Sequence, residues 1–242
     1  MQKRTLIGML TPSSNTVLEP LTSLMLADLY PEVTAHFGRF RVREIALDEQ
    51  ALGQFDETPI LEAARLLADA RLDVLCWNGT SAGWLGFETD ERLCETLTAD
   101  TGIPATSSVL ALNELLGRQG VTRLGLVTPY LDEVQARIVA NYAGLGIDCV
   151  AERHLGDRGN FSFSDYEEAT IESLIREVAA ARPEAITTFC TNLRAAPVAA
   201  RLEAELDIPI YDTVTVALWK ALTLTGVDPA RVRGWGRMFT DS

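Results

Sequence analysis

Short apolar runs alternate with longer segments of helical periodicity along the entire chain, and this alternation restricts the fold more than any other feature. We predict strands at eight of the runs: Leu6–Leu10, Thr34–Phe40, Val74–Trp77, Ala105–Ser107, Leu124–Val127, Cys149–Arg153, Ile186–Phe189 and Ile208–Tyr211. We predict one helix after each of them: Thr16–Ala27, Pro59–Ala70, Glu88–Thr101, Val109–Gln119, Asp132–Leu145, Tyr166–Ala181, Ala195–Leu206 and Val214–Leu224. Such alternation is typical of an α/β fold with parallel sheets covered by helices on both faces. Ligands in these sheets bind beyond the carboxyl ends of the strands, so the residues just after each strand are the functional candidates.

Three pairs of segments match between the two halves of the chain and occur in the same order. The pairs are Gly8–Pro12 with Gly125–Pro129, Arg71–Thr80 with Arg182–Thr191, and Ile103-Pro104 and Val109 with Ile208-Pro209 and Val214. We therefore predict two doubly wound halves related by a pseudo-twofold axis. Residues 1–115 plus 216–242 would form the first half, and residues 116–215 the second. Their strand ends would face one cleft, in which Gly79 of the first half lies opposite Cys190 of the second.

Charge and composition argue against several classes of partner. The 242 residues carry a net charge of −13, and an acidic surface disfavours binding to nucleic-acid phosphates or to anionic membranes. No window approaches 18 unbroken apolar residues, and the apolar stretch near the N-terminus is too short and interrupted for a signal peptide. Four cysteines without a C-x-x-C pair indicate neither a zinc site nor a disulfide framework, so we expect a reduced, cytoplasmic protein. A homo-oligomer is compatible with all of these features.

Several motifs, spread along nearly the whole chain, resemble those of one superfamily. They are Pro12-Ser13-Ser14-Asn15-Thr16 with Glu19, Gly79-Thr80-Ser81, Val127–Asp132 around Tyr130, Asn160, Cys190-Thr191-Asn192 and the tail Gly234–Ser242. On these motifs the chain resembles the aspartate/glutamate racemase superfamily, in the branch that holds arylmalonate decarboxylase and maleate cis-trans isomerase. The resemblance implies an enzyme of two similar α/β halves that needs no cofactor and no metal. The only histidines, His36 and His154, also lack any metal-ligand spacing.

Within this resemblance, Cys190 falls on the second catalytic cysteine, and Gly79 falls on the position of the first, where it lacks the thiol. Racemases of the superfamily use two cysteines on opposite faces of the substrate carbon, and maleate isomerases use the first as a nucleophile. Arylmalonate decarboxylases share the absence of the first thiol, and a single cysteine protonates the enediolate left after loss of CO₂. We therefore favour a cofactor-independent decarboxylase of a small malonate-type dicarboxylate, with Cys190 as its proton donor.

The resemblance also implies a set of substrate-binding residues: Pro12, Ser13, Asn15, Thr80, Ser81, Tyr130, Asn160 and Thr191. The hydroxyls of Thr80, Ser81 and Tyr130, with backbone N–H groups near Thr80 and Thr191, are candidates to stabilise the developing charge of an enediolate. A free thiol titrates near pH ~8.5, so an ordinary cysteine is protonated at neutral pH and suited to donate a proton. Trp77 and Trp84 flank the Gly79–Ser81 motif and either wall the pocket or pack in the core.

The sequence leaves three other functions open. A maleate cis-trans isomerase is supported by Pro12–Asn15 and Asn160, and an Asp/Glu-type racemase would require an unidentified second base. A catalytically silent carboxylate-binding protein is supported by Gly79. The candidate residues also have purely structural interpretations, because a cysteine after a buried strand is often a core residue and Thr80 and Ser81 can cap a helix.

Three arginines lie at and just after the end of the second predicted strand, with a spacing of two. Arg39, Arg41 and Arg43 alternate with Phe40 and Val42, which places three guanidinium groups on one side of an extended segment. They form either a solvated face or a clamp for a second carboxylate. The corresponding segment of the decarboxylases is largely small and apolar, so this departure argues against an arylmalonate as the substrate.

Overall fold

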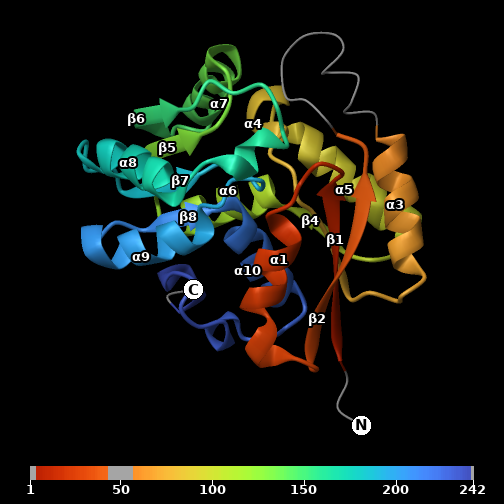
Figure 1. The fold of residues 1–242 in the computed structure, drawn as a ribbon. Coiled ribbons are helices and arrows are strands. Elements are labelled where there is room, and N and C mark those ends of the chain that lie inside the picture. Colours follow the sequence, from red (N-terminus) through yellow and green to blue (C-terminus); the bar gives the residue numbers. More distant parts are fainter. Residues whose placement is uncertain (1–3, 43–56, 241–242) are drawn as a thin grey trace.

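The computed structural model describes residues 4–42 and 57–240 and contains two four-stranded parallel sheets (Figure 1). The strands are β1 (Thr5–Pro12), β2 (Val33–Phe40), β3 (Val74–Trp77), β4 (Ala105–Ser107), β5 (Arg123–Thr128), β6 (Asp148–His154), β7 (Ala185–Thr188) and β8 (Ile210–Asp212). The first sheet has the order β2-β1-β3-β4 and the second the order β6-β5-β7-β8. Each predicted strand is present, and the predicted α/β fold of two similar halves is confirmed.

Helices connect successive strands, as parallel pairing requires. They are α1 (Leu18–Met25), α3 (Thr58–Ala68), α4 (Ala82–Leu85), α5 (Glu88–Thr101), α6 (Ser108–Arg118), α7 (Asp132–Gly144), α8 (Glu168–Ala179), α9 (Ala196–Leu206) and α10 (Thr213–Leu224). Short 3-10 turns lie at η1 (Ala27–Leu29), η3 (Ser162–Asp165), η4 (Pro229–Arg231) and η5 (Arg237–Phe239). The eight predicted helices are confirmed, and among the described residues the one-turn helix α4 and the 3-10 turns were not expected.

The internal repeat is visible in how the first strand of each sheet packs. A Cβ at Gly8 would lie 2.7 Å from the Leu75 side chain, and a Cβ at Gly125 would lie 3.0 Å from the Ile186 side chain. Leu75 and Ile186 occupy matching positions in the repeated segments. Both glycines are therefore required by the same close approach between a central strand and its neighbour.

A matching hydrogen bond also starts the central strand of each half. The Leu6 N–H donates to Asp73 over 2.9 Å, and the Arg123 N–H donates to Glu184 over 3.0 Å. Asp73 lies two residues after Arg71, and Glu184 lies two residues after Arg182. Both arginines have a positive φ. Backbone conformation and side-chain contacts thus repeat between the halves together with the sequence.

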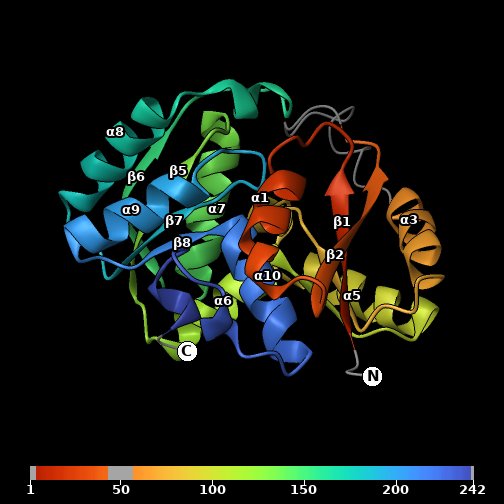
Figure 2. The same ribbon diagram turned by 60° about the horizontal axis from the view of Figure 1, so that its bottom comes forward.

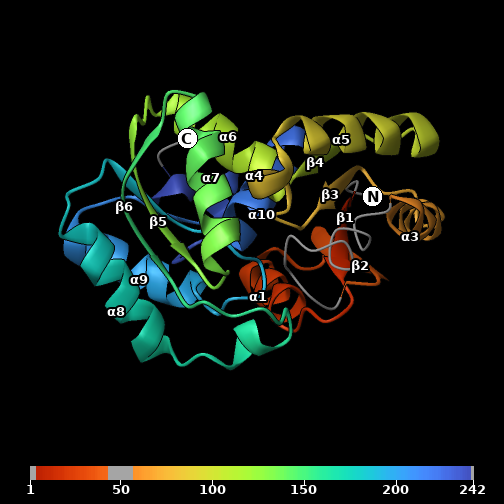
Figure 3. The same cartoon turned by 90° about the horizontal axis from the view of Figure 1, so that it is seen from above.

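The two sheets, each with its helices, lie side by side in the molecule (Figure 2). On the first sheet, α3 and α5 cover one face, while α1 and α10 pack on the other. Around the second sheet, α8 and α9 lie on the outer side, and α7 lies toward the first half, where it contacts α4 (Figure 3). No helix within the described residues combines the length and apolar character needed to cross a bilayer.

Helix α10 joins the halves, because it follows β8 of the second sheet yet packs against α6, β3 and β4. The chain after it touches both sides: Arg231 pairs with Glu32, whereas the Arg237 N–H donates to Glu203. We propose that the segment from residue 216 belongs with the first half, since most of the contacts of α10 lie there.

Candidate active site

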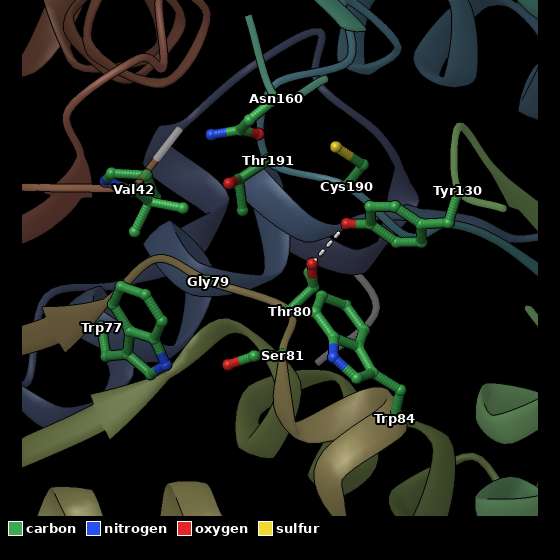
Figure 4. A pocket seen from close by; sticks show the side chains of 11 residues that line it. Val42, Trp77, Gly79, Thr80, Ser81, Trp84, Tyr130, Asn160, Cys190 and Thr191 are labelled. Carbon is green, nitrogen blue, oxygen red and sulfur yellow. Dashed lines mark hydrogen bonds between the residues drawn. The ribbon is translucent and has the colours of Figure 1, made fainter. Parts of the chain in front are cut away.

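A pocket lies between the halves at the carboxyl ends of β1, β3, β5 and β7 (Figure 4). Its walls are formed by Pro12, Val42, Trp77, Gly79, Thr80, Ser81, Trp84, Tyr130, Asn160, Cys190 and Thr191. Eight of the ten residues expected at the site are thus brought together, and Ser13 and Asn15 lie just outside. The free space is about 20 Å³, room for about one water molecule, so a dicarboxylate requires the pocket to widen.

Two hydroxyls form the polar centre of the pocket. Thr80 follows β3 and Tyr130 follows β5, and their hydroxyl oxygens lie 2.6 Å apart within a hydrogen bond. The Tyr130 ring is packed edge-on against Trp84 and Phe163, with ring centroids 5.1 and 5.6 Å away. Burial raises the pKa of Tyr130 well above its usual value, so this phenol stays neutral and can donate a hydrogen bond.

Cys190 lies two residues after β7 and is only 1% exposed. Burial is the main cause that raises the pKa of this thiol to about 12. Hydrogen bonds from the Tyr130 hydroxyl and the Asn192 N–H favour the thiolate, while the nearby Asp212 carboxyl opposes it. Because burial prevails, Cys190 carries its proton at neutral pH and is suited to act as an acid.

Gly79, the counterpart of Cys190 in the repeat, has no room for a side chain. A Cβ at this position would lie 1.9 Å from Cζ2 of Trp77, far closer than two carbon atoms approach without a bond. The described pocket therefore offers a thiol from one side only. Cys76, three residues earlier, is fully buried within β3 and belongs to the core, as expected from its apolar strand.

Asn15 supports the pocket without lining it. Its side-chain N–H groups donate to the Thr191 carbonyl and hydroxyl oxygens over 3.0 and 3.2 Å. Its Oδ1 accepts the N–H groups of Val17 and Leu18, both over 2.9 Å, at the start of α1. Thr191 in turn donates its hydroxyl to the Asn78 carbonyl over 3.0 Å. Asn15 thus fixes the segment that carries Cys190 to the first half of the protein.

Asn160 reaches the pocket from the segment between β6 and α8. Its side-chain N–H donates to the Ser14 hydroxyl over 2.9 Å, and its main-chain carbonyl accepts a hydrogen bond from the side-chain amide of Asn192. Ser13 does not enter the pocket, because its hydroxyl exchanges hydrogen bonds with the backbone of Val42, at 3.1 and 3.2 Å. The Pro12–Asn15 motif therefore acts mainly through the backbone and the loops that it holds.

The arginines at the end of β2 and just after it do not line the pocket where the structure describes them. Arg39 is half exposed, pairs with Glu19 over 2.8 Å and donates to the Ser13 carbonyl over 2.9 Å. Arg41 is exposed, and Arg43 lies outside the described residues. Every described side chain that lines the pocket is uncharged in its ordinary state at neutral pH. The described residues also contain no cluster of three or more His, Cys, Asp or Glu side chains able to hold a metal ion.

The sequence argument did not identify every residue near the pocket. Val42 lines the pocket because side chains alternate along this extended segment, so that Arg39 and Arg41 point outward and Val42 points inward. The alternation is visible in the sequence. Asp212 ends β8, is completely buried and caps α10 by accepting the Val214 N–H. Its place at the end of a strand is the signal that could have identified it, because Asp212 occupies the position that Ser107 holds in the first half.

Comparison with known proteins agrees with this geometry. The chain is 26% identical over 240 residues to the arylmalonate decarboxylase of Bordetella bronchiseptica, covering 96% of this chain and 98% of that protein. It is 25% identical over 232 residues to the maleate isomerase of Geobacillus stearothermophilus, covering 92% of each. The fold matches a crystal structure of a maleate isomerase from Pseudomonas putida S16 with maleate, at a TM-score of 0.87, 24% identity and 98% coverage of both chains. Residues 7–239 match the model of the arylmalonate decarboxylase family, and the chain therefore belongs to that family.

Proposed function

We propose that this protein decarboxylates a small malonate-type dicarboxylate without a cofactor, through an enediolate that Cys190 protonates. The observation that carries the proposal is the one-sided pocket. A protonated thiol stands on one side, and Gly79, with no room for a second thiol, stands in the other half. Membership of the arylmalonate decarboxylase family supports the same reaction.

The reaction needs a site that stabilises negative charge after the carbon–carbon bond breaks. When CO₂ leaves, the electron pair of the broken bond moves into the remaining carboxylate and gives an enediolate. The hydroxyls of Thr80 and Tyr130 share one hydrogen bond at 2.6 Å and are shielded from water, which leaves one of their two hydrogens to donate to an enediolate oxygen. Preorganised donors of this kind contribute most in a dry site.

Cys190 then transfers its thiol proton to the α-carbon, which yields a monocarboxylic acid and a thiolate. The raised pKa of Cys190 makes the thiolate unstable in its buried position, so it regains a proton from solvent before the next turnover. The net change is a dicarboxylate plus one proton giving a monocarboxylate plus CO₂. A nucleophilic role would require a stable thiolate, which burial disfavours.

The proposal is tested with malonate, methylmalonate and phenylmalonate, by NMR detection of the monocarboxylic products. We expect turnover of at least one of these acids, and loss of nearly all of it in Cys190→Ala. The matched control is Cys149→Ala, a thiol in β6 away from the pocket, which should keep full activity. Unchanged turnover in Cys190→Ala would overturn the role of Cys190, and no turnover of any malonate would overturn the proposed function.

A maleate cis-trans isomerase is the second candidate. It is favoured by Asn160 in the pocket wall and by the similarity to maleate isomerases over more than nine-tenths of the chain. The isomerase chemistry implied by the resemblance uses a nucleophilic thiol at position 79, where this chain has glycine. Incubation with maleate and NMR detection of fumarate separates the two functions, and we expect no fumarate.

A further inference from the structure

We propose that Trp77 sets the substrate range of this pocket, because its indole closes the Gly79 side to an aryl substituent on the malonate. The proposal rests on the function proposed above and adds the substrate class. The indole of Trp77 fills the volume beside Gly79, where a side chain would otherwise stand, and separates the pocket from a second cavity behind it.

The indole is in direct conflict with any side chain at position 79. A Cβ there would lie 1.9, 2.3 and 2.6 Å from Cζ2, Cη2 and Cε2 of Trp77, which are all atoms of its six-membered ring. The backbone φ of Gly79 lies outside the left-handed region that only glycine favours. Glycine is therefore required at position 79 by the bulk of Trp77 and not by the conformation of the chain.

Trp77 is held in this position by two neighbours. Its Nε1–H donates to Asp90 over 3.0 Å, and its ring packs against Phe40 with centroids 5.0 Å apart. Trp77 and Asp90 are each 2% exposed. Rotation of the indole would leave a buried N–H and a buried carboxyl without this hydrogen bond, which is unfavourable. The pocket wall formed by Trp77 is therefore fixed, and widening must come from other sides.

A second cavity of about 110 Å³ lies behind that wall. Trp77 and Ser81 line both spaces. The remaining walls of the second cavity are formed by Glu57, Ile60, Leu85, Thr89, Asp90, Arg92 and Leu93. Replacing the indole with a smaller side chain would join the two spaces on the Gly79 side. An aryl substituent could then occupy the joined volume, whereas the present indole closes that side of the pocket.

The test compares kcat/KM for methylmalonate and phenylmalonate in the wild-type protein and in Trp77→Val. We expect Trp77→Val to raise kcat/KM for phenylmalonate relative to methylmalonate by about 10–100-fold over the wild-type ratio, since pocket volume discriminates apolar groups by such factors. Trp219→Val is the matched control, because it removes a buried indole in α10 that does not line the pocket. Its preference should equal that of the wild type.

An unchanged ratio of the two kcat/KM values in Trp77→Val would overturn the role of Trp77 and leave the proposed function intact. Turnover of neither acid would instead overturn the proposed function. A second readout does not depend on activity. Gly79→Ala should lower the melting temperature of the wild type by about 3–10 °C through overpacking, and much less in the Trp77→Val background. An equal fall in both backgrounds would overturn the proposal.

Discussion

Replacement of Asp212 by asparagine should weaken the dependence of the free energy of unfolding on pH. This carboxyl is completely buried, accepts the Thr188 hydroxyl over 2.7 Å and caps α10 through the Val214 N–H over 2.9 Å. Burial outweighs these hydrogen bonds and raises the pKa of Asp212 from 3.8 to about 7. Asparagine keeps an acceptor for the cap but cannot titrate.

The size and sign of the effect follow from this shift. Between about pH 4 and pH 7 the folded protein holds a proton on Asp212 that the unfolded chain has lost, so the free energy of unfolding falls as the pH rises. A shift of about three pKa units corresponds to about 4 kcal/mol over the full range. Above pH 7 the contribution of Asp212 to the free energy of unfolding no longer changes. Measurements at pH 5 and pH 8 therefore capture about 2–3 kcal/mol of the total change.

Urea unfolding followed by circular dichroism, at pH 5 and pH 8, measures the effect. The loss of stability between the two pH values should be smaller in Asp212→Asn than in the wild type by about 2–3 kcal/mol. Asp28→Asn, a change at an exposed carboxyl of η1, serves as the control and should leave the difference unchanged. An Asp212→Asn protein with the same pH dependence as the wild type would refute this account of the buried carboxyl.

Three further substitutions test other parts of the site. Tyr130→Phe should lower kcat by about 10²–10³-fold in a steady-state assay, because it removes one enediolate donor and leaves the Thr80 hydroxyl unpaired; a change below threefold would contradict this role. Asn15→Ala should lower the free energy of unfolding by about 1–3 kcal/mol in urea titrations, since four hydrogen bonds of a buried amide are lost. Arg39→Ala should leave KM within a factor of about two, because its exposed ion pair with Glu19 contributes little and lies outside the pocket; a large rise in KM would indicate a carboxylate clamp.

The order of strands and helices could be predicted from the sequence because each half repeats one pattern. Alternation located every strand of the two sheets, and the matched segments placed Gly79 and Cys190 in one cleft. The helix Ala82–Leu85 was missed because a single turn of mostly apolar residues has no periodicity to detect. Helices α1 and α8 were also predicted two residues too long at each end, since helix boundaries depend on local capping.

The finer arrangement of the site depends on contacts that no sequence pattern records. Nothing in the motif around Gly79 shows that the Trp77 indole turns back over the glycine, because that orientation follows from the hydrogen bond to Asp90 in α5. Asn15 is a second example. This residue, predicted to bind substrate, also joins α1 to the backbone beside Cys190, a contact that the motif does not reveal. Such long-range pairings are fixed by tertiary packing and not by local sequence.

In the proposed reaction, one thiol delivers one proton to one face of the enediolate. The stereochemistry of the product tests this most directly. Decarboxylation of 2-ethyl-2-methylmalonate gives chiral 2-methylbutanoate, whose enantiomers are separated by chiral chromatography. A pocket with Cys190 as its single acid should give one enantiomer in large excess, and Cys190→Ala should give almost no product. A racemic product from the wild type, or undiminished turnover in Cys190→Ala, would contradict the account.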